Sequence, residues 1–296
     1  MLALDANRFI YVADRYVHKV RKVSPTGVVT TLAGCGSATW TDGTGTAAAF
    51  YQPTDVVVDT AGNVYVADMV NNRVRKITTA RVVTTFAGSG SSTPVNGIGT
   101  SAAFYYPCGL AIDTSANLYV AEFYGYRVRK ITPLGVATTI AGTTNGYLDG
   151  VGTSARFSNL YDVAVDTLGN LYVTDNSYNQ LRMISSAGVV TTLAGSTGTT
   201  AGATDGLGTS ALFNAPEGII IDSSGNLFVS DYTNNKIRKV TTYGLVVTFA
   251  GSGTYSAIDG VGSAATFRYN AGIAMDSSNT IYVVDSNNYC KNHYFR

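Results

Sequence analysis

One segment of about 16 residues recurs six times along this chain of 296 residues. In its clearest copy, residues 62–77, a β-compatible run ends in an acid and is followed by a polar bend and a basic, β-branched run. The acid falls at Asp14, Asp68, Glu122, Asp175, Asp231 and Asp285, a spacing of 53 to 56 residues. Since repetition outweighs length as a guide to domain count, the repeat predicts one domain rather than two.

Each repeat predicts four short strands, which we call a to d. In the second repeat these strands are residues 55–59, 64–67, 73–77 and 82–88, and Gly62 supplies the unusual dihedral of the a–b turn. Four antiparallel strands separated by turns form a propeller blade. The blades are expected at approximately residues 1–34, 50–88, 104–142, 157–195, 213–251 and 267–296. We therefore predict an all-β fold, a single six-bladed β-propeller without helices, whose last blade lacks strand d.

Long, Gly-rich loops connect strand d of each blade to strand a of the next. Each loop ends in a similar run, such as residues 41–50 and 148–157, with a fixed Asp-Gly, Gly and Phe. We expect Asp42 and its equivalents to cap a turn, the glycines to allow positive φ, and Phe50 and its equivalents to fill the space between blades.

The pattern Phe-x-x-Pro-x-Gly, apolar strand, Asp-x-x-Gly-Asn-Leu-Tyr-Val-Ala-Asp and Asn-Arg-Ile-Arg resembles the NHL repeat. The fifth blade carries it most fully, at Phe213, Pro216, Gly218, Asp222, Gly225, Asn226, Val229, Asp231, Asn235, Lys236, Ile237 and Arg238. The resemblance covers essentially the whole chain and implies a six-bladed propeller. It says little about function, because one fold carries many unrelated sites.

Composition and charge exclude several classes of protein. The net charge is +1 and 13% of residues are charged, so the one-sided basic surface that nucleic acid requires is not expected. No run of 18 apolar residues predicts a membrane span, and no signal peptide is visible, although the chain begins inside a repeat and an upstream leader or domain stays open. Cys35, Cys108 and Cys290 occupy unrelated repeat positions, which favours neither a disulfide framework nor a zinc site.

Two sets of acids repeat with the blades. The acids that end strand b are followed five residues later by a base, and we expect these pairs to meet across the b–c bend: Asp14–Lys19, Asp68–Arg73, Glu122–Arg127 and Asp231–Lys236. The acids that end strand a precede a tight turn whose backbone they can bind: Asp59, Asp113, Asp166, Asp222 and Asp276. A ring of catalytic carboxylates is the alternative, but a role that repeats in every blade is structural.

Three acids break the repeat. Asp55 and Asp162 stand where other blades have Gly, and Glu217 comes one residue before that position. Because strand a lines the central channel of a propeller, these carboxylates would face the channel mouth and could hold calcium, which prefers oxygen ligands. The resemblance implies the same, since lactonase-like propellers use such a site, although their Asn ligands have no match here. A mildly acidic channel rim is the alternative.

Aromatic residues gather on the face that bears the b–c and d–a loops. They are Tyr16, Trp40, Tyr51, Tyr105, Tyr106, Phe123, Tyr124, Tyr126, Tyr147, Tyr161, Tyr178, Tyr232, Tyr255, Tyr269 and Tyr289. Many aromatic and few charged residues are typical of recognition surfaces. Packing of the long loops onto the propeller is the alternative.

The third blade departs most from the repeat. Its b–c bend contains Phe123 and Tyr124, and Gly125 and Tyr126 replace the polar Asn pair that usually ends the bend in sister blades. Tyr105 and Tyr106 enter from the preceding loop. We predict that these rings form an exposed binding site for a protein or carbohydrate ligand. The chain is thus interpreted as a monomeric, extracellular or cell-surface binding module. A calcium-dependent hydrolase or lactonase and a structural segment of a larger surface protein are the alternatives.

If Asp55, Asp162 and Glu217 converge on a cation, millimolar calcium should raise the melting temperature, because a ligand that binds the folded state stabilises it by mass action. The shift should vanish in Asp162→Ala. Differential scanning fluorimetry measures both, and an unchanged melting temperature in calcium would remove the support for the metal-dependent enzyme.

Overall fold

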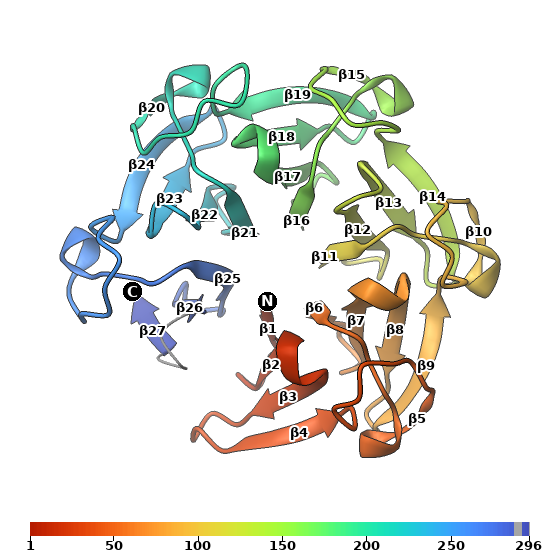
Figure 1. The fold of residues 1–296 in the computed structure, drawn as a ribbon. Helices are drawn as coiled ribbons and strands as arrows, with labels where there is room; N and C mark the ends of the chain where they lie inside the picture. The colour runs from red at the N-terminus through yellow and green to blue at the C-terminus, as the bar shows by residue number, and fades with distance from the viewer. Residues whose placement is uncertain (287–291, 296) are drawn as a thin grey trace. The chain divides into compact units, whose positions relative to one another are not determined.

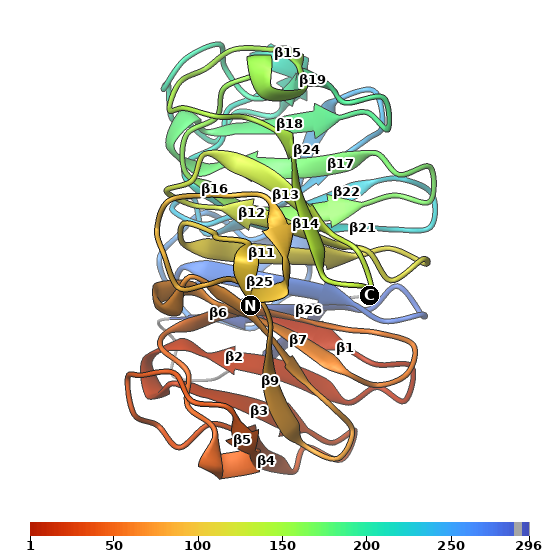
Figure 2. The same cartoon turned by 90° about the vertical axis from the view of Figure 1, so that its right-hand side faces the viewer.

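The computed structural model describes residues 1–286 and 292–295, and these residues form two compact units, Met1–Ile140 and Ala141–Arg296. The described residues contain six antiparallel sheets (Figure 1). Figure 2 shows the strands side-on, with hairpins at both ends of the sheets. Tyr289 and Cys290, which the sequence analysis named, lie outside the described residues. No described helix is both long enough and apolar enough to cross a bilayer.

The first unit contains three sheets. The first is built from β1 (Leu2–Leu4), β2 (Ile10–Asp14), β3 (Lys19–Val23) and β4 (Val29–Ala33). The second is built from β5 (Gly43–Thr44), β6 (Pro53–Val58), β7 (Val64–Asp68), β8 (Arg73–Ile77) and β9 (Val82–Ala87). The third is built from β10 (Gly97–Ile98), β11 (Pro107–Ile112), β12 (Leu118–Glu122), β13 (Arg127–Ile131) and β14 (Val136–Ala141). The predicted strands b and c therefore match the structure closely.

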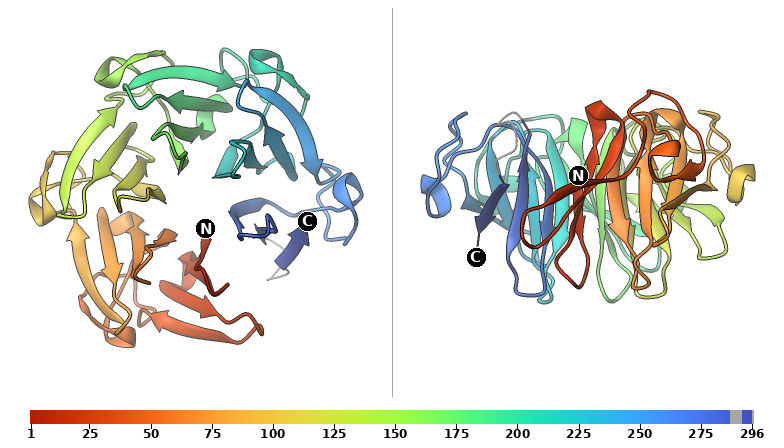
Figure 3. Two further views of the ribbon diagram at one scale, coloured as in Figure 1. Left: turned by 180° about the vertical axis from the view of Figure 1, so that it is seen from behind. Right: turned by 90° about the horizontal axis from the view of Figure 1, so that it is seen from below.

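The second unit repeats this plan. One sheet has β15 (Gly150–Val151), β16 (Leu160–Val165), β17 (Leu171–Asp175), β18 (Gln180–Ile184) and β19 (Val189–Ala194). The next has β20 (Gly206–Leu207), β21 (Pro216–Ile221), β22 (Leu227–Asp231), β23 (Lys236–Val240) and β24 (Leu245–Ala250). The last has β25 (Asn270–Met275), β26 (Ile281–Asp285) and β27 (Asn292–Phe295), so no strand d is present among its described residues, as predicted. Colours within each sheet stay close in Figure 3, because each sheet is built mainly from consecutive strands.

The d–a loops are more regular than predicted. Residues 43–44 form the short strand β5, which pairs with the outer strand β9 in the register Gly43–Val83 and Thr44–Val82. Strands β10, β15 and β20 pair with β14, β19 and β24 in the same way. A single 3₁₀ turn follows each short strand: η2 (Gly45–Ala47), η4 (Gly99–Ser101), η5 (Gly152–Ser154) and η7 (Gly208–Ser210). Four sheets therefore have five strands instead of four, and the expectation of no helix misses these turns.

Further 3₁₀ turns are η1 (Arg15–Val17), η3 (Met69–Asn71) and η6 (Asn176–Tyr178) in the b–c bends, and η8 (Gly262–Ala264) in the last d–a loop. The acids that end strand a bind their own turns, as expected. In the second sheet, Asp59 Oδ1 accepts hydrogen bonds from the backbone N–H groups of Ala61 at 3.0 Å and Asn63 at 2.8 Å. These bonds fix the a–b hairpin locally, and the Tyr65 hydroxyl of strand b donates to the same carboxylate at 3.4 Å.

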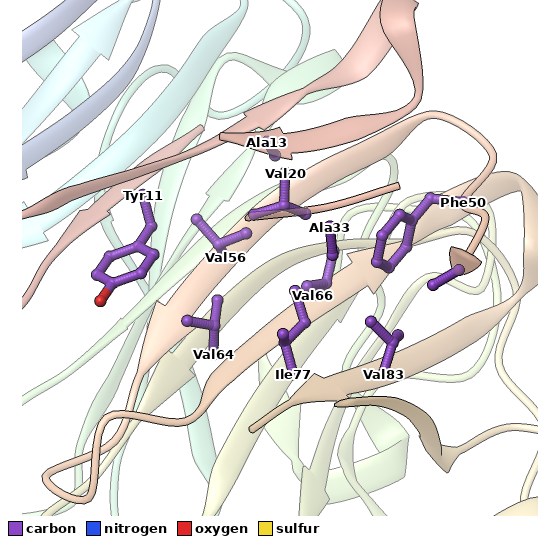
Figure 4. Packing of buried hydrophobic residues seen from close by; sticks show 11 residues of the cluster. Tyr11, Ala13, Val20, Ala33, Phe50, Val56, Val64, Val66, Ile77 and Val83 are labelled. Atoms are coloured by element: carbon purple, nitrogen blue, oxygen red, sulfur yellow. The ribbon is translucent and has the colours of Figure 1, made fainter. Parts of the chain in front are cut away.

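The hydrophobic core of the first unit lies between neighbouring sheets. Figure 4 shows one cluster, in which Val20 and Ala33 of the first sheet pack with Phe50, Val66 and Val83. Phe50 is fully buried at the end of its loop, which confirms that this ring fills the space between sheets. Its equivalents Phe104, Phe157, Phe213 and Phe267 are also fully buried.

A buried arginine organises each five-stranded sheet. Arg75 donates through Nη1 to Asp68 at 2.9 Å and through Nη2 to Asp42 at 2.7 Å, and it also donates to the loop carbonyls of Thr41 and Ala49. Asp42 belongs to the long loop, so one guanidinium joins the b–c bend, strand c and the loop. The same arrangement occurs at Arg182 and Arg238, and at Arg129 the amide oxygen of Asn96 takes the place of the loop carboxylate.

Two sequence predictions about these charges are wrong. The strand-b acids pair with the base seven residues later rather than five: Asp14–Arg21, Asp68–Arg75, Glu122–Arg129 and Asp231–Arg238, not Lys19, Arg73, Arg127 and Lys236. Arg73 lies directly opposite Asp68, but the long Arg75 side chain reaches the acid from the diagonal position. Asp42 does not cap a turn, because its Oδ1 accepts from Arg75 and from the Thr85 hydroxyl.

Replacing Arg75 by Met should lower the free energy of unfolding by about 3–5 kcal/mol, because it leaves the buried Asp68 carboxylate without its ion-pair partner. Arg21→Met is the matched control. Its side chain and that of Asp14 are 30% and 34% exposed, so its loss should cost about 1 kcal/mol or less. Urea unfolding of both variants measures the difference, and similar losses would show that burial of the pair is unimportant.

Candidate functional site

Four aromatic rings cluster at one end of the third sheet. Tyr124 is at the centre, with ring centroids 4.8 Å from Phe123, 5.1 Å from Tyr106 and 5.8 Å from Tyr105. Tyr105 and Tyr106 are a further 5.5 Å apart in an edge-to-face arrangement. Because the d–a loop and the b–c bend reach the same end of an antiparallel sheet, residues about 18 positions apart meet here. We call these residues, together with Tyr126, the aromatic cluster.

The backbone holds this cluster in place. The N–H of Phe123 donates to the carbonyl of Tyr106 at 2.9 Å, which ties the bend to the loop. Tyr106 and Tyr126 both adopt left-handed backbone conformations, each with φ of 54°, which tyrosine rarely does. The residue before Tyr126 must be glycine, since a Cβ on Gly125 would overlap the Glu122 side chain. Sequence reasoning identified Gly125 as a departure from the repeat but not this steric reason.

The rings differ in exposure. Tyr124 is 40% exposed, whereas Tyr105, Tyr106, Phe123 and Tyr126 are half-buried. None of the five is buried in the core. The accessible surface thus comprises one prominent ring supported by four partly covered ones.

A buried carboxyl group lies directly beneath the aromatic cluster. Burial raises the pKa of Glu122 to about 7, and the attraction of Arg129, whose Nη1 lies 2.7 Å from Glu122 Oε1, opposes this shift. Glu122 also begins the bend, since its carbonyl accepts the N–H of Tyr126 at 3.2 Å. The backbone of Glu122 therefore helps to fix the bend of the cluster, and its carboxyl group is shielded from solvent.

The sequence analysis missed an amide link between neighbouring sheets. Asn72 adopts φ of 54°; its Oδ1 accepts the N–H of Tyr106 at 2.9 Å and its Nδ2 donates to the carbonyl of Gly90 at 3.2 Å. Asn179 and Asn235 make the same two kinds of contact inside the second unit. The signal was the asparagine that ends the bends, which suits a left-handed residue. Asn72 thereby positions Tyr106 for the aromatic cluster.

The three acids proposed as metal ligands are all buried. Asp55 accepts the N–H groups of Val56 and Leu110, both at 2.8 Å, and Asp162 accepts those of Val163 at 2.8 Å and Ile219 at 2.9 Å. These carboxylates thus bind neighbouring strands. The described residues hold no group of three His, Cys, Asp or Glu side chains suited to a metal ion.

The three acids are divided between the two units. Asp55 belongs to the first unit, and Asp162 and Glu217 belong to the second. Their convergence on calcium therefore stays a prediction. What the structure adds is a different task for Asp55 and Asp162, which join strand a of one sheet to strand a of the next within each unit.

Comparison with known proteins agrees with the repeat. The NHL repeat profile matches residues 50–77, which run from Phe50 to the end of β8. Human NHL repeat-containing protein 2 is 30% identical over 276 residues, covering 78% of this chain. The chain is an NHL-repeat protein. It spans 37% of the length of that relative, so the activity of the whole relative is not transferred by the match.

Solved structures support the propeller fold of this NHL-repeat protein. An auxiliary nutrient binding protein from Bacteroides thetaiotaomicron superposes with a TM-score of 0.71 at 15% identity, covering 96% of this chain and 65% of the other. A gluconolactonase from Xanthomonas campestris superposes with a TM-score of 0.62 at 11% identity, covering 96% and 82%. At such identities the likeness shows the fold alone, an all-β propeller of small antiparallel sheets.

Asp55 should make stability depend on pH. Burial raises its pKa to about 7, against about 3.9 in an unfolded chain. Between these values the folded protein retains a proton that the unfolded chain releases, so the free energy of unfolding falls as pH rises from about 4 to 7. Asp55→Asn removes this contribution and should show a smaller change. Urea unfolding at both ends of this range tests it, and an equal pH dependence in the variant and the parent would contradict the assignment.

Proposed function

We propose that this NHL-repeat protein is a binding module that recognises a protein or carbohydrate ligand through the aromatic cluster. The main support for this proposal is the exposed Tyr124 ring, which contacts Tyr105, Tyr106 and Phe123 at one end of the third sheet. A large ring held by neighbouring rings loses little conformational freedom on binding, which is why aromatic residues dominate recognition hot spots.

Comparison with the sister sheets supports a role beyond folding. The positions of Phe123 and Tyr124 are held by Met69 and Val70 in the second sheet and by Asn176 and Ser177 in the fourth. Sister bends have smaller aromatic contacts, Tyr178 with Tyr147 and Tyr232 with Tyr269, and form without a cluster of four rings. The third sheet also gives up the linking asparagine of its relatives for Tyr126. Extra aromatic surface that the fold does not require is best explained by a partner.

The proposal includes the arrangement of the six sheets as blades of one closed propeller. The repeat spacing and the fold of the solved relatives support it. The metal-dependent hydrolase is less well supported, because Asp55 and Asp162 both use their carboxylates to bind backbone N–H groups.

Tyr124→Ala should weaken ligand binding by about 1–2 kcal/mol or more while the free energy of unfolding changes little, because the ring is exposed but central to the cluster. Ligands are first selected with a glycan array and an array of extracellular proteins, and affinities are then measured by calorimetry. Tyr243→Ala, at a c–d turn on the opposite end of a sheet, is the matched control and should bind like the parent. Equal affinity of both variants would contradict the proposal.

A further inference from the structure

A cavity of about 490 Å³ lies between the first and second sheets, at the end that bears the a–b turns. Its apolar wall is formed by Leu4 and Leu32 of the first sheet and by Val58 and Val64 of the second. The a–b turns of both sheets complete the lining, and all of these residues belong to the first unit. The volume is within the range of small-molecule sites in proteins.

The space beside Tyr11 is less completely filled than its equivalent in the second sheet. There, Phe86 holds the place of Leu32 and packs edge-to-face against Tyr65, with ring centroids 5.1 Å apart. Tyr11 is the counterpart of Tyr65, and it belongs with Val64 to the core cluster of Figure 4. Because leucine is smaller than phenylalanine, the first sheet leaves room between its own strands and those of the second sheet.

The acid of the first a–b turn has an open acceptor position in this cavity. In the second sheet, Asp59 Oδ2 accepts the side-chain amide of Asn63 at 2.8 Å, and the third, fourth and fifth sheets repeat this bond. Phe9 replaces that asparagine in the first sheet. Among the described residues, Asp5 Oδ2 therefore accepts only the hydroxyl of Tyr11, at 3.0 Å. One of its lone pairs is left for a ligand.

An ammonium group lies on the other side of the same tyrosine. The Nζ of Lys22 is 4.1 Å from the ring centroid of Phe9 and 5.0 Å from that of Tyr11. No ion pair in the described part of the chain includes Lys22. Since Lys22 lies over the Tyr11 ring, the apolar surface left for a ligand is mainly aliphatic. The cavity thus presents a cation, an anion and an aliphatic wall together.

We propose that this cavity binds a small zwitterion with an aliphatic body, of the kind that an apolar α-amino acid represents. Its ammonium group donates to Asp5 Oδ2 and its carboxylate accepts from Lys22 Nζ, both as charge-assisted hydrogen bonds. Its aliphatic side chain lies against Leu4 and Leu32. A carboxylate alone is repelled by Asp5 and Asp59, and an amine alone is repelled by Lys22, so a ligand with both charges is complementary. This site goes beyond the proposed function, since it is separate from the aromatic cluster.

Isothermal titration calorimetry with L-leucine at pH 7 tests the proposal, and one molecule should bind per chain. Two analogues each lack one charge: 4-methylpentanoate has no ammonium group and 3-methylbutylamine has no carboxylate. Each should bind at least about tenfold more weakly than leucine, because a charge-assisted hydrogen bond is lost and a repulsive charge is left unbalanced. Absence of leucine binding by the parent, or equal affinity for all three compounds, would contradict the proposal.

Three variants locate the site. Asp5→Asn and Lys22→Met should each weaken leucine binding by about tenfold, because each removes one charge partner. Leu32→Phe should abolish binding, since it fills the cavity with the residue that the second sheet carries. Lys76→Met is the matched control: Lys76 is the counterpart of Lys22 but does not line the cavity, so this variant should bind leucine like the parent.

These variants also keep the test decisive if one of them fails to fold. Asp5→Asn preserves the turn, because the retained Oδ1 still accepts the N–H groups of Asn7 and Phe9, both at 2.9 Å. Tyr124→Ala should bind leucine like the parent, so failure of this site and failure of the aromatic cluster are distinguishable. Undiminished leucine binding by Lys22→Met or Leu32→Phe with an unchanged circular dichroism spectrum would overturn the proposal. Loss of leucine binding in Tyr124→Ala would also overturn it, by assigning leucine to the aromatic cluster.

Discussion

The five-stranded sheets depend on the hydrogen bonds and ion pairs made by a fully buried arginine in strand c. Arg75 illustrates why, because its guanidinium binds an acid of the b–c bend, an acid of the long loop and two loop carbonyls at once. The loop phenylalanine, Phe50, lies beside the same guanidinium, 5.4 Å from ring centroid to Cζ. One residue thus connects the polar and apolar parts of the loop to the sheet. A guanidinium suits this place because its donors have a fixed fork geometry.

The regular part of the fold was predictable because it repeats. Period-two alternation and tight-turn residues gave strands such as Arg73–Ile77 with the bounds that the structure has. The partner of Asp68 was not predictable in this way, because two arginines lie on the same side of strand c and spacing cannot choose between the opposite and the diagonal neighbour. The pairing of Gly43–Thr44 with β9 was also hidden, since a two-residue strand has no periodicity to detect.

The aromatic cluster shows a similar division. Its members could be named from the sequence because they interrupt a repeat, and the topology of an antiparallel sheet brings Tyr106 and Tyr124 to the same end. Their unequal exposure could not be read in advance, since it depends on the left-handed backbone of Tyr106 and Tyr126 and on the amide of Asn72. For the acids, Asp55 looked like a ligand because it departs from the repeat, but its burial and its bond to Leu110 depend on how two strands pack.

Because the loop before strand a completes the sheet, the repeat defined by sequence and the repeat defined by structure have different bounds. By sequence, the second repeat is defined from strand a onward, yet its sheet is completed by β5 and by Asp42, which precede that strand. The structural repeat therefore extends from about residue 41 to Ala87 rather than from Pro53 to the next loop. Recombination or gene duplication that cuts within residues 34–40, before the loop acid, would exchange whole modules. A cut between Asp42 and Pro53 would instead separate Arg75 from its loop acid and join that acid to a sheet in which it has no equivalent arginine to bind.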